Sequence, residues 1–355
     1  MEVSGGGRCN VTNSFASVAD LAAVYPRGHR LMGRLMRQFD QRGAYAWFER
    51  RGVRLVTQPD DCVFPQSQDA RSISHLFLRE ARRLGISVQT GRRATSIGEL
   101  LGEADFVVIA IGGQPRREGL VWLDEPIEEP VPSLFTLSID DTALHGLMGT
   151  VVERAQVMLP GTKLRADGPL LLTHWGVSGP SVLRLSSYGA RLLHDCDYRH
   201  PLSINWSGMT ADEAARELHR LQSTAARRLM TTTHPADMQQ RLWQHLLVRA
   251  LGPGRAAAPW GSLNQKEHNR LVNVLTNDTY AIAGRAPHRD EFVTCGGVSL
   301  TAVSAQTLES KRHPHLYFAG EVLDIDGVTG GFNFQCAWTT AHTVARAIAS
   351  QAGSR

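Results

Sequence analysis

The chain has 355 residues, of which 42% are hydrophobic and 20% are charged, and it carries a net charge of +4. This length accommodates two domains or one large domain with an insertion, and the composition is that of an ordinary globular protein. No apolar run approaches the roughly 20 residues that a membrane-spanning helix needs, so we expect no membrane partner.

The cysteines argue against a small cross-linked domain. All five are scattered along the chain, and none occurs in Cys-x-x-Cys spacing. The pattern favours neither a disulfide framework nor a zinc site, so we expect no metal. The first residues also lack the basic and apolar regions of a secretory signal, and both observations indicate the reducing cytoplasm.

Arginine dominates the basic residues. Only Lys163, Lys266 and Lys311 of the 38 basic residues are lysines, which leaves 35 arginines. Such a bias arises either from recognition of RNA or phosphate, which arginine binds in a bidentate manner, or, more often, from the nucleotide composition of the gene. The net charge alone is too small to imply nucleic-acid binding.

A glycine run marks the first predicted element. Residues 4–13 read SGGGRCNVTN, which predicts a loop whose backbone and side-chain amides hold a polar ligand. A linker remnant is the alternative interpretation. The residues that we expect to contact the ligand are Gly5, Gly6, Gly7, Arg8, Cys9 and Asn10.

A βαβ-like stretch follows this loop. Its predicted elements are a helical region at 29–51, a short strand at 53–57, a helix from Asp69 to about residue 84, and strands at 86–89 and 105–111. The last strand is apolar and β-branched, which is typical of a strand buried on both faces. It ends in Gly112 and Gly113, where the carboxyl end of a strand meets a cofactor crevice.

The middle of the chain changes character. Residues 126–132 contain three prolines, which predicts a linker, and residues 133–294 then mix candidate strands with helices. We therefore expect an inserted second domain. The predicted boundaries are 1–132 for the first part of domain one, 133–294 for the insertion and 295–355 for the return to domain one.

The stretch from residue 316 to 338 organises the rest of the chain. A short apolar strand at 316–319 is followed by a loop with acidic residues and glycines, and then by an apolar helix over about 333–349. This order is typical of nucleotide-cofactor sites, because glycines allow close backbone approach and helix N–H groups face ligand oxygens. The predicted cofactor-binding residues here are Gly320, Glu321, Asp324, Gly330, Gly331, Phe332 and Asn333.

Six stretches spread over almost the whole chain form distinctive patterns. They are residues 4–13, Phe64-Pro65 with Ser67 and Ala70, residues 173–180 (THWGVSGP), Thr294 with Gly296-Gly297-Val298, Glu309-Ser310-Lys311, and residues 320–333. In this order they resemble the BaiN/RdsA-type flavoproteins, a bacterial family of NAD(P)/FAD-dependent oxidoreductases.

The resemblance implies an α/β fold. It consists of a Rossmann-like, two-dinucleotide-binding-type FAD domain that is interrupted by a domain with a β-barrel-like core and helices. By position, Glu321 corresponds to the carboxylate that contacts the ribityl chain of FAD, and residues 330–333 lie where a helix N-terminus faces the N1/O2 edge of the flavin. Residues 5–10 pass beside the flavin or the pyrophosphate, and Gly112-Gly113 line the adenosine side.

The chain departs from the family pattern in two places. The family has a strand, a Gly-x-Gly-x-x-Gly turn, a helix and a second strand before SGGGRCN, and we expect the chain to lack this unit of about 30–40 residues. The FAD domain is then incomplete at its N-terminal side. The Gly-rich segment after Gly113 is also shorter than in the family, spanning only residues 114–129.

The resemblance implies hydride transfer from reduced FAD to an electron-poor C=C bond, with NAD(P)H as the reductant. The acceptor is either a small conjugated substrate or uridine in 23S ribosomal RNA, which would yield dihydrouridine. Candidate proton donors or charge partners are His174, Cys295 and Lys311. The alternative is a truncated, non-catalytic remnant that is unable to retain FAD.

Overall fold

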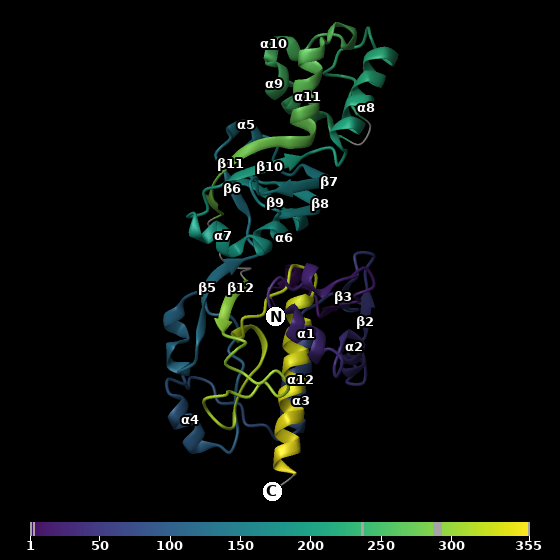
Figure 1. Ribbon diagram of the computed structural model, residues 1–355. Coiled ribbons are helices and arrows are strands. Elements are labelled where there is room, and N and C mark those ends of the chain that lie inside the picture. Colours follow the sequence, from purple (N-terminus) through teal and green to yellow (C-terminus); the bar gives the residue numbers. More distant parts are fainter. Residues whose placement is uncertain (1, 3, 236–237, 287–292, 354–355) are drawn as a thin grey trace. The chain divides into compact units, whose positions relative to one another are not determined.

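The computed structural model describes residues 2, 4–235, 238–286 and 293–353. Its contacts divide the chain into two compact units (Figure 1). The first unit comprises Met1–Ser133 and Asp290–Arg355, and the second comprises Leu134–Arg289. Both units combine helices with strands, and the second is built on a barrel, so the expected α/β fold with an inserted barrel and helices is confirmed.

The first unit contains small sheets. The strands β1 (Thr12–Asn13), β3 (Cys62–Pro65) and β2 (Leu55–Thr57) form an antiparallel sheet in that order. The strands β4 (Val107–Ile109) and β13 (Leu316–Phe318) form a parallel pair, with Leu316 opposite Val107. β13 is buried throughout, as its apolar sequence predicts.

Two sequence predictions for this unit are wrong. The strand expected at 105–111 is not buried on both faces, because Val108 in the middle of β4 is 44% exposed. Residues 86–89 form no strand, and Ile86 and Val88 are more than half exposed. An apolar β-branched pattern predicts a buried strand only where neighbouring segments cover it.

The proline-rich segment at 126–132 is a strand and not a linker. β5 (Ile127–Ser133) pairs antiparallel with β12 (Val293–Val298), with Thr294 opposite Pro132 and Cys295 opposite Val131. Proline is tolerated here because each strand of a two-stranded ribbon needs its N–H groups on one side only.

Among its described residues, the first unit also contains the α-helices α1 (His29–Leu35), α2 (Gln41–Glu49), α3 (Arg71–Arg83), α4 (Ile97–Glu103) and α12 (Phe332–Ala352). The helical region predicted at 29–51 is two helices, because the Asp40 side chain accepts a hydrogen bond from the Gly43 N–H at 2.9 Å and starts α2 there. Aromatic rings join α2, α3 and α12, with Trp338 lying 5.5 Å from Phe48 and 5.6 Å from Phe77 between ring centroids.

The second unit is built on a closed barrel. Its strands follow the order β10 (Pro201–Asn205), β11 (Asp278–Arg285), β6 (Leu137–Ile139), β9 (Gly176–Ser178), β8 (Arg165–Leu172) and β7 (Val151–Met158), and β7 pairs again with β10. All these pairs are antiparallel. Closure leaves no unpaired edge, and residues such as Val157 and Ile204 are fully buried.

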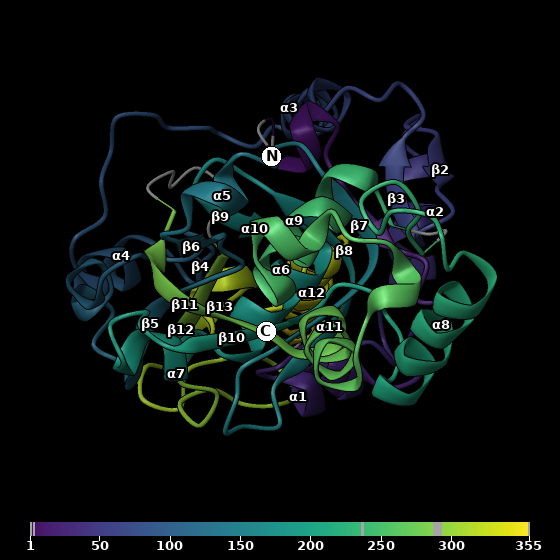
Figure 2. The same ribbon diagram turned by 90° about the horizontal axis from the view of Figure 1, so that it is seen from above.

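Helices lie at both ends of this barrel. The short α5 (Thr142–His145) follows β6, while α6 (Pro180–Tyr188) and α7 (Ala190–Asp195) follow β9. The end where α5 lies also carries α8 (Ala211–Thr224), α9 (Gln240–Leu251), α10 (Pro253–Ala256) and α11 (Gln265–Asn277), while α6 and α7 lie at the opposite end (Figure 1). α11 packs against both α8 and α9 (Figures 1 and 2).

The four helices α8 to α11 have a core of their own. The rings of Trp243 and Trp260 are fully buried and stack at 5.9 Å, and each indole N–H donates to a backbone carbonyl. Capping boxes of Thr210 with Glu213 and of Asn264 with Glu267 start α8 and α11. No helix in the part of the chain that the structure describes is long and apolar enough to cross a membrane.

Candidate functional site

Three segments that are far apart in the sequence meet at Glu321. This residue lies in the short 3-10 helix Gly320–Val322 directly after β13. The N–H of Thr294, on β12, donates a hydrogen bond of 2.8 Å to Glu321 Oε1. Gly113 follows β4, and a Cβ built there would lie 2.6 Å from Glu321 Oε1 and 2.5 Å from Thr294 Oγ1. A side chain at residue 113 would therefore have to displace the Glu321 carboxyl group and the Thr294 hydroxyl.

The Glu321 carboxyl group lies in a strongly desolvating environment. Burial raises its pKa, the N–H groups of Thr294 and Gly113 lower it, and the negative charge of Asp326 raises it again. The net pKa is raised from the ordinary value. Burial of a carboxyl group at the ends of the parallel strands β4 and β13 is typical of a ligand site at the crevice of an α/β sheet.

The backbone beside Glu321 is open to close approach by a ligand. Gly112 and Gly320 have φ angles of +75° and +76°, which favour glycine. A Cβ at Gly112 would have no neighbour within 4 Å, and one at Gly320 would meet only Ala337 at 3.8 Å. The Gly320 N–H donates to Thr340 Oγ1 on α12 at 2.9 Å, which holds the loop against the helix.

The N-terminus of α12 lies against the segment that follows the glycine run. Gly331, with φ of +89°, is its N-cap, and no side chain caps this helix. A Cβ at Gly331 would overlap the carbonyl group of Thr12 and would lie 2.8 Å from Asn10 Oδ1. Asn13 Nδ2 donates to the Gly330 carbonyl at 3.0 Å. The structure therefore brings together two of the predicted cofactor-binding segments.

Phe332 and Asn333 are engaged within the protein. The Phe332 ring packs edge-on against Phe15 and Tyr25, and the Tyr25 hydroxyl donates to the Phe332 carbonyl at 2.8 Å. The Asn333 side-chain amide accepts from the Gly327 N–H at 2.7 Å and donates to the Gly327 carbonyl at 2.8 Å. These contacts hold the loop before α12 in shape.

The glycine run itself is a 3-10 turn, Ser4–Gly7, that contains Gly5 and Gly6. The Gly7 carbonyl accepts from the Ala70 N–H at 2.9 Å, and the Arg8 guanidinium lies 4.3 Å from the centre of the Phe64 ring. Cys9 is fully buried in the hydrophobic cluster around Phe48 and Ile73. Asn10 Oδ1 accepts from the Val63 N–H at 3.2 Å.

A buried ion pair in this region has no clear signal in the sequence. The guanidinium of Arg27 donates two hydrogen bonds to the carboxylate of Asp326, which is fully buried. Ser133 Oγ also donates to Asp326 Oδ2 at 3.2 Å. A contact between residues 299 positions apart depends on the tertiary fold. Asp324 lies close enough for its charge to raise the pKa of Arg27.

The three candidate catalytic residues lie in different places. Cys295 is buried on β12, next to Thr294, and acts electrostatically on Arg27. Lys311 is exposed in the loop between β12 and β13, where Nζ donates to the Thr301 carbonyl at 2.8 Å. His174 is exposed between β8 and β9 of the second unit and packs on Trp175. Among the described residues, no group of three His, Cys, Asp or Glu side chains could hold a metal ion.

The ends of the parallel strands β4 and β13 are surrounded by glycines, the carboxyl group of Glu321 and an uncapped helix N-terminus. This arrangement is that of a Rossmann-type unit, and the barrel unit is inserted into its sequence. Residues 1–116 match the family model described as HI0933-like protein Rossmann domain. Residues 131–293 match the model described as HI0933-like protein barrel and H2TH domain. The chain belongs to this HI0933-like family, which contains the BaiN/RdsA-type proteins that the sequence resembles.

Two curated relatives match nearly the whole chain, and a third matches about two thirds of it. The 3-dehydro-bile acid delta(4,6)-reductase of Clostridium scindens is 24% identical over 98% of this chain and 89% of its own length. The ribosomal RNA dihydrouridine synthase of Escherichia coli is 27% identical over 97% of this chain and 87% of its own. The synthase of the same name from Haemophilus influenzae is 27% identical over 64% of this chain and 53% of its own. These names are those of oxidoreductases.

Proposed function

We propose that this chain is an FAD-dependent reductase that transfers hydride to an electron-poor C=C bond, with NAD(P)H as the reductant. The observation that carries this proposal is the meeting of Gly113, Thr294 and Glu321 at the ends of parallel strands. The names of the relatives support it, because each denotes the reduction of a C=C bond or its product.

The residues fit an extended dinucleotide cofactor. Open backbone at Gly112 and Gly320 allows a ligand to approach closely, and both glycines flank the partly buried carboxyl group of Glu321. In the proposal, Glu321 accepts a hydrogen bond from a ribityl hydroxyl of FAD, and Gly112-Gly113 line its adenosine side. FAD supplies the hydride-transfer chemistry when it is bound.

The N-terminus of α12 has an electrostatic role in this proposal. The N–H groups of its first turn carry partial positive charge, and no side chain caps them. They stabilise negative charge on a ligand that lies against Gly330 and Gly331. Asn10 lies beside Gly331, so the segment at 5–10 lines the same place.

A proton must complete the reduction, and His174, Cys295 and Lys311 stay the proposed donors or charge partners. Of these three residues, Cys295 is next in sequence to Thr294, whose N–H donates a hydrogen bond to Glu321. Neighbouring residues of a strand point to opposite faces, so its thiol lies on the side of β12 away from the Thr294 side chain. Exchange of each residue for Ala, with hydride transfer measured separately from flavin binding, assigns the role.

The proposed acceptor is either a small conjugated substrate, as in the name of the bile-acid relative, or uridine in 23S ribosomal RNA, as in the name of the synthases. Mass mapping of ribosomal RNA from a strain that lacks the gene separates the two. Loss of a dihydrouridine supports the RNA acceptor, and an unchanged dihydrouridine content contradicts it.

Cofactor binding is tested by titrating the full chain with FAD and following flavin absorption and fluorescence. We expect Glu321→Gln to weaken FAD binding about 10- to 100-fold, because it removes a charged hydrogen-bond acceptor worth about 1.5–3 kcal/mol. The exposed Glu103, which pairs with Arg92, provides the matched control Glu103→Gln and should bind FAD like the unmodified chain.

Two results would contradict the proposal. Equal FAD affinity of both variants would remove Glu321 from the site. Absence of any flavin spectrum in the unmodified chain, before and after addition of FAD, would favour the alternative of a non-catalytic remnant.

A further inference from the structure

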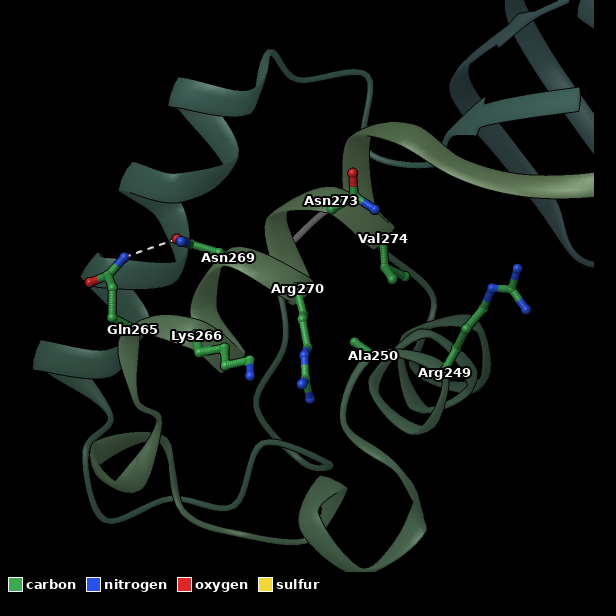
Figure 3. A pocket seen from close by; sticks show the side chains of 8 residues that line it. All are labelled: Arg249, Ala250, Gln265, Lys266, Asn269, Arg270, Asn273 and Val274. Carbon is green, nitrogen blue, oxygen red and sulfur yellow. Dashed lines mark hydrogen bonds between the residues drawn. The ribbon is translucent and has the colours of Figure 1, made fainter. Parts of the chain in front are cut away.

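The helical end of the second unit carries an open groove beside α11, and most of the residues that line it have basic or amide side chains. Figure 3 shows the side chains that line it, which come from α9 and α11. They are Arg249, Ala250, Gln265, Lys266, Asn269, Arg270, Asn273 and Val274. The groove has a volume of about 770 Å³. Its lining contains basic and amide side chains but no carboxylate.

The exposed face of α11 forms one wall of the groove. Gln265, Lys266, Asn269, Arg270 and Asn273 are all exposed, and they recur at the spacing of one helix face. Leu271 and Leu275, on the opposite face, are buried against the rest of the unit. The exposed face spans about 12 Å along the helix, which is several phosphate spacings of a nucleic-acid strand.

Positive charge is concentrated in this part of the chain. Residues 211–277 contain nine lysines and arginines against five aspartates and glutamates, an excess of four that equals the net charge of the whole chain. Outside this segment, the numbers of basic and acidic residues are therefore equal. The basic excess belongs to the helices at this end of the unit.

Two acidic residues of this segment are engaged in ion pairs. Glu267 accepts from Arg255 at 2.7 Å, and this ion pair, with the Asn264 N–H, lowers the pKa of Glu267 to about 2. Glu217 pairs with Arg220 at 2.6 Å. Lys266 and Arg270 are different, because within the described residues neither takes part in a hydrogen bond or an ion pair, although the charge of Arg270 also acts on Glu267.

Arg249 has a structural role at the edge of the groove. Its guanidinium donates to Asp278 Oδ1 at 2.6 Å and lies 4.2 Å from the centre of the Tyr280 ring. Both partners are on β11, so this contact attaches α9 to the barrel. The basic groups left for a ligand are therefore Lys266 and Arg270, which extend from α11 in Figure 3.

We propose that this groove binds the phosphate backbone of an RNA strand. Lys266 and Arg270 contact successive phosphates, while Asn269, Asn273 and Gln265 donate hydrogen bonds to phosphate or ribose oxygens. A small apolar substrate is a poorer match, because pockets for such ligands are enclosed and this groove is open. The inference goes beyond the reductase function and does not depend on flavin binding.

The test is the affinity of the full-length chain for a short fluorescein-labelled single-stranded RNA, measured by fluorescence anisotropy over a series of salt concentrations. We expect the double variant Lys266→Ala/Arg270→Ala to lose at least about tenfold in affinity, since each removes a charged hydrogen bond. The slope of log affinity against log salt should fall by about 1.4, because about 0.7 is lost per phosphate contact on a single strand.

Two further variants sharpen the test. Asn273→Asp adds a negative charge to the groove without removing a cation, and it should also weaken RNA binding. Arg82→Ala/Arg93→Ala removes the same charge from two exposed arginines of the first unit and should change the affinity less than about twofold.

Three outcomes would overturn the proposal. The first is an equal loss of RNA affinity in the two double variants, which would indicate attraction by total charge. The second is an unchanged RNA affinity in the groove variants. The third is displacement of the RNA by polyglutamate as readily as by unlabelled RNA, which would indicate an acidic protein partner. Flavin absorption of each variant is recorded in parallel. A chain that binds RNA but no flavin contradicts the reductase proposal alone, and the reverse result contradicts the groove alone.

Discussion

The β-strands of the two units are paired in different ways. In the second unit, six strands form a barrel in which each strand is paired on both sides. In the first unit, the strands form separate sheets of two or three, and contacts between remote segments hold them together. The large apolar side chains with the greatest exposure reflect this difference. In the first unit they are Val56, Leu78, Leu84, Ile86, Val88, Val108, Ile111 and Val121, and in the second they are Met148, Leu229 and Val248.

The difference shows where each unit is vulnerable. A closed barrel distributes its stability over many backbone hydrogen bonds, so no single polar side chain dominates. The first unit depends on a few buried polar contacts, among them the Arg27–Asp326 pair and the hydrogen bond of 2.6 Å from Thr12 to Gln335. Single substitutions should therefore affect the two units through different kinds of contact.

Removal of the buried cation should have the largest effect. Arg27→Ala leaves the carboxylate of Asp326 buried without its partner, and we expect the first unit to lose about 3–5 kcal/mol in stability. Hydrogen exchange read by mass spectrometry reports each unit separately, and the second unit should keep its protection. Arg71→Ala, which breaks an exposed pair with Asp69, is the control and should leave the stability of the first unit almost unchanged. Similar losses in both variants would refute this account of the first unit.

A backbone contact should be the weak point of the barrel. Gly176, with φ of +151°, lies where β9 meets β6, and a Cβ there would overlap the Leu137 carbonyl and lie 2.6 Å from the Ile139 nitrogen. We expect Gly176→Ala to destabilise the second unit by about 1–3 kcal/mol.

The same unit offers a matched control for this substitution. Gly161→Ala also introduces a side chain at positive φ, but nothing lies within 4 Å of its Cβ. The free energies of unfolding of the two variants, measured with heat and with denaturant, are compared. The difference between them gives the cost of the steric overlap at Gly176, because both variants share the cost of the positive φ angle. If both lose the same stability, the close approach of β6 and β9 is not what requires glycine.

The smallest expected effect is a pH dependence of the helical end of the second unit. His268 is buried and stacks on His219 at 3.9 Å between ring centroids. Burial, and then the charge of His219, lower the pKa of His268 below its ordinary value of 6.5. Below about pH 6.5 the unfolded chain therefore binds more protons than the folded one, so stability falls as the pH decreases and is fully present above that value.

Replacement of the histidine tests this assignment. The melting temperature of the unmodified chain should decrease from pH 7 to pH 5, and part of this decrease should disappear in His268→Leu. His245, whose pKa burial also lowers, accounts for a remaining part. An unchanged pH profile in the variant would exclude His268 as a source of the dependence.

Much of the barrel and of α12 follows from local patterns. The apolar helix expected at 333–349 is found at Phe332–Ala352, and the mixture of strands and helices expected over 133–294 is found as the barrel and its helices. The errors have tertiary causes. Prolines at 126–132 indicated a linker, yet an antiparallel partner, β12, makes this segment a strand.

The candidate site was predictable only in part. Gly113 and Glu321 each follow a predicted strand, and both were predicted to bind the cofactor. In the structure these two residues lie side by side. The hydrogen bond from Thr294 to Glu321 was missed because its donor is a backbone N–H, which every residue but proline has. The Arg27–Asp326 pair was missed because periodicity describes neighbours along a helix and not partners 299 residues away. The groove beside α11 needed the fold to show which polar residues share an exposed face.

The separation between Arg27 and Asp326 has a consequence for synthesis on the ribosome. The barrel unit is one continuous stretch, so it can fold as soon as its own residues have emerged. Residues 1–133 cannot complete their packing until α12 and the loop before it have been synthesised. These segments lie about 200 residues further on, and translation of the intervening residues takes about 10–40 s. During that interval the apolar faces of α2 and α3, which later pack against Trp338, are uncovered. We therefore expect the first unit to expose apolar surface for longer during synthesis than the barrel unit.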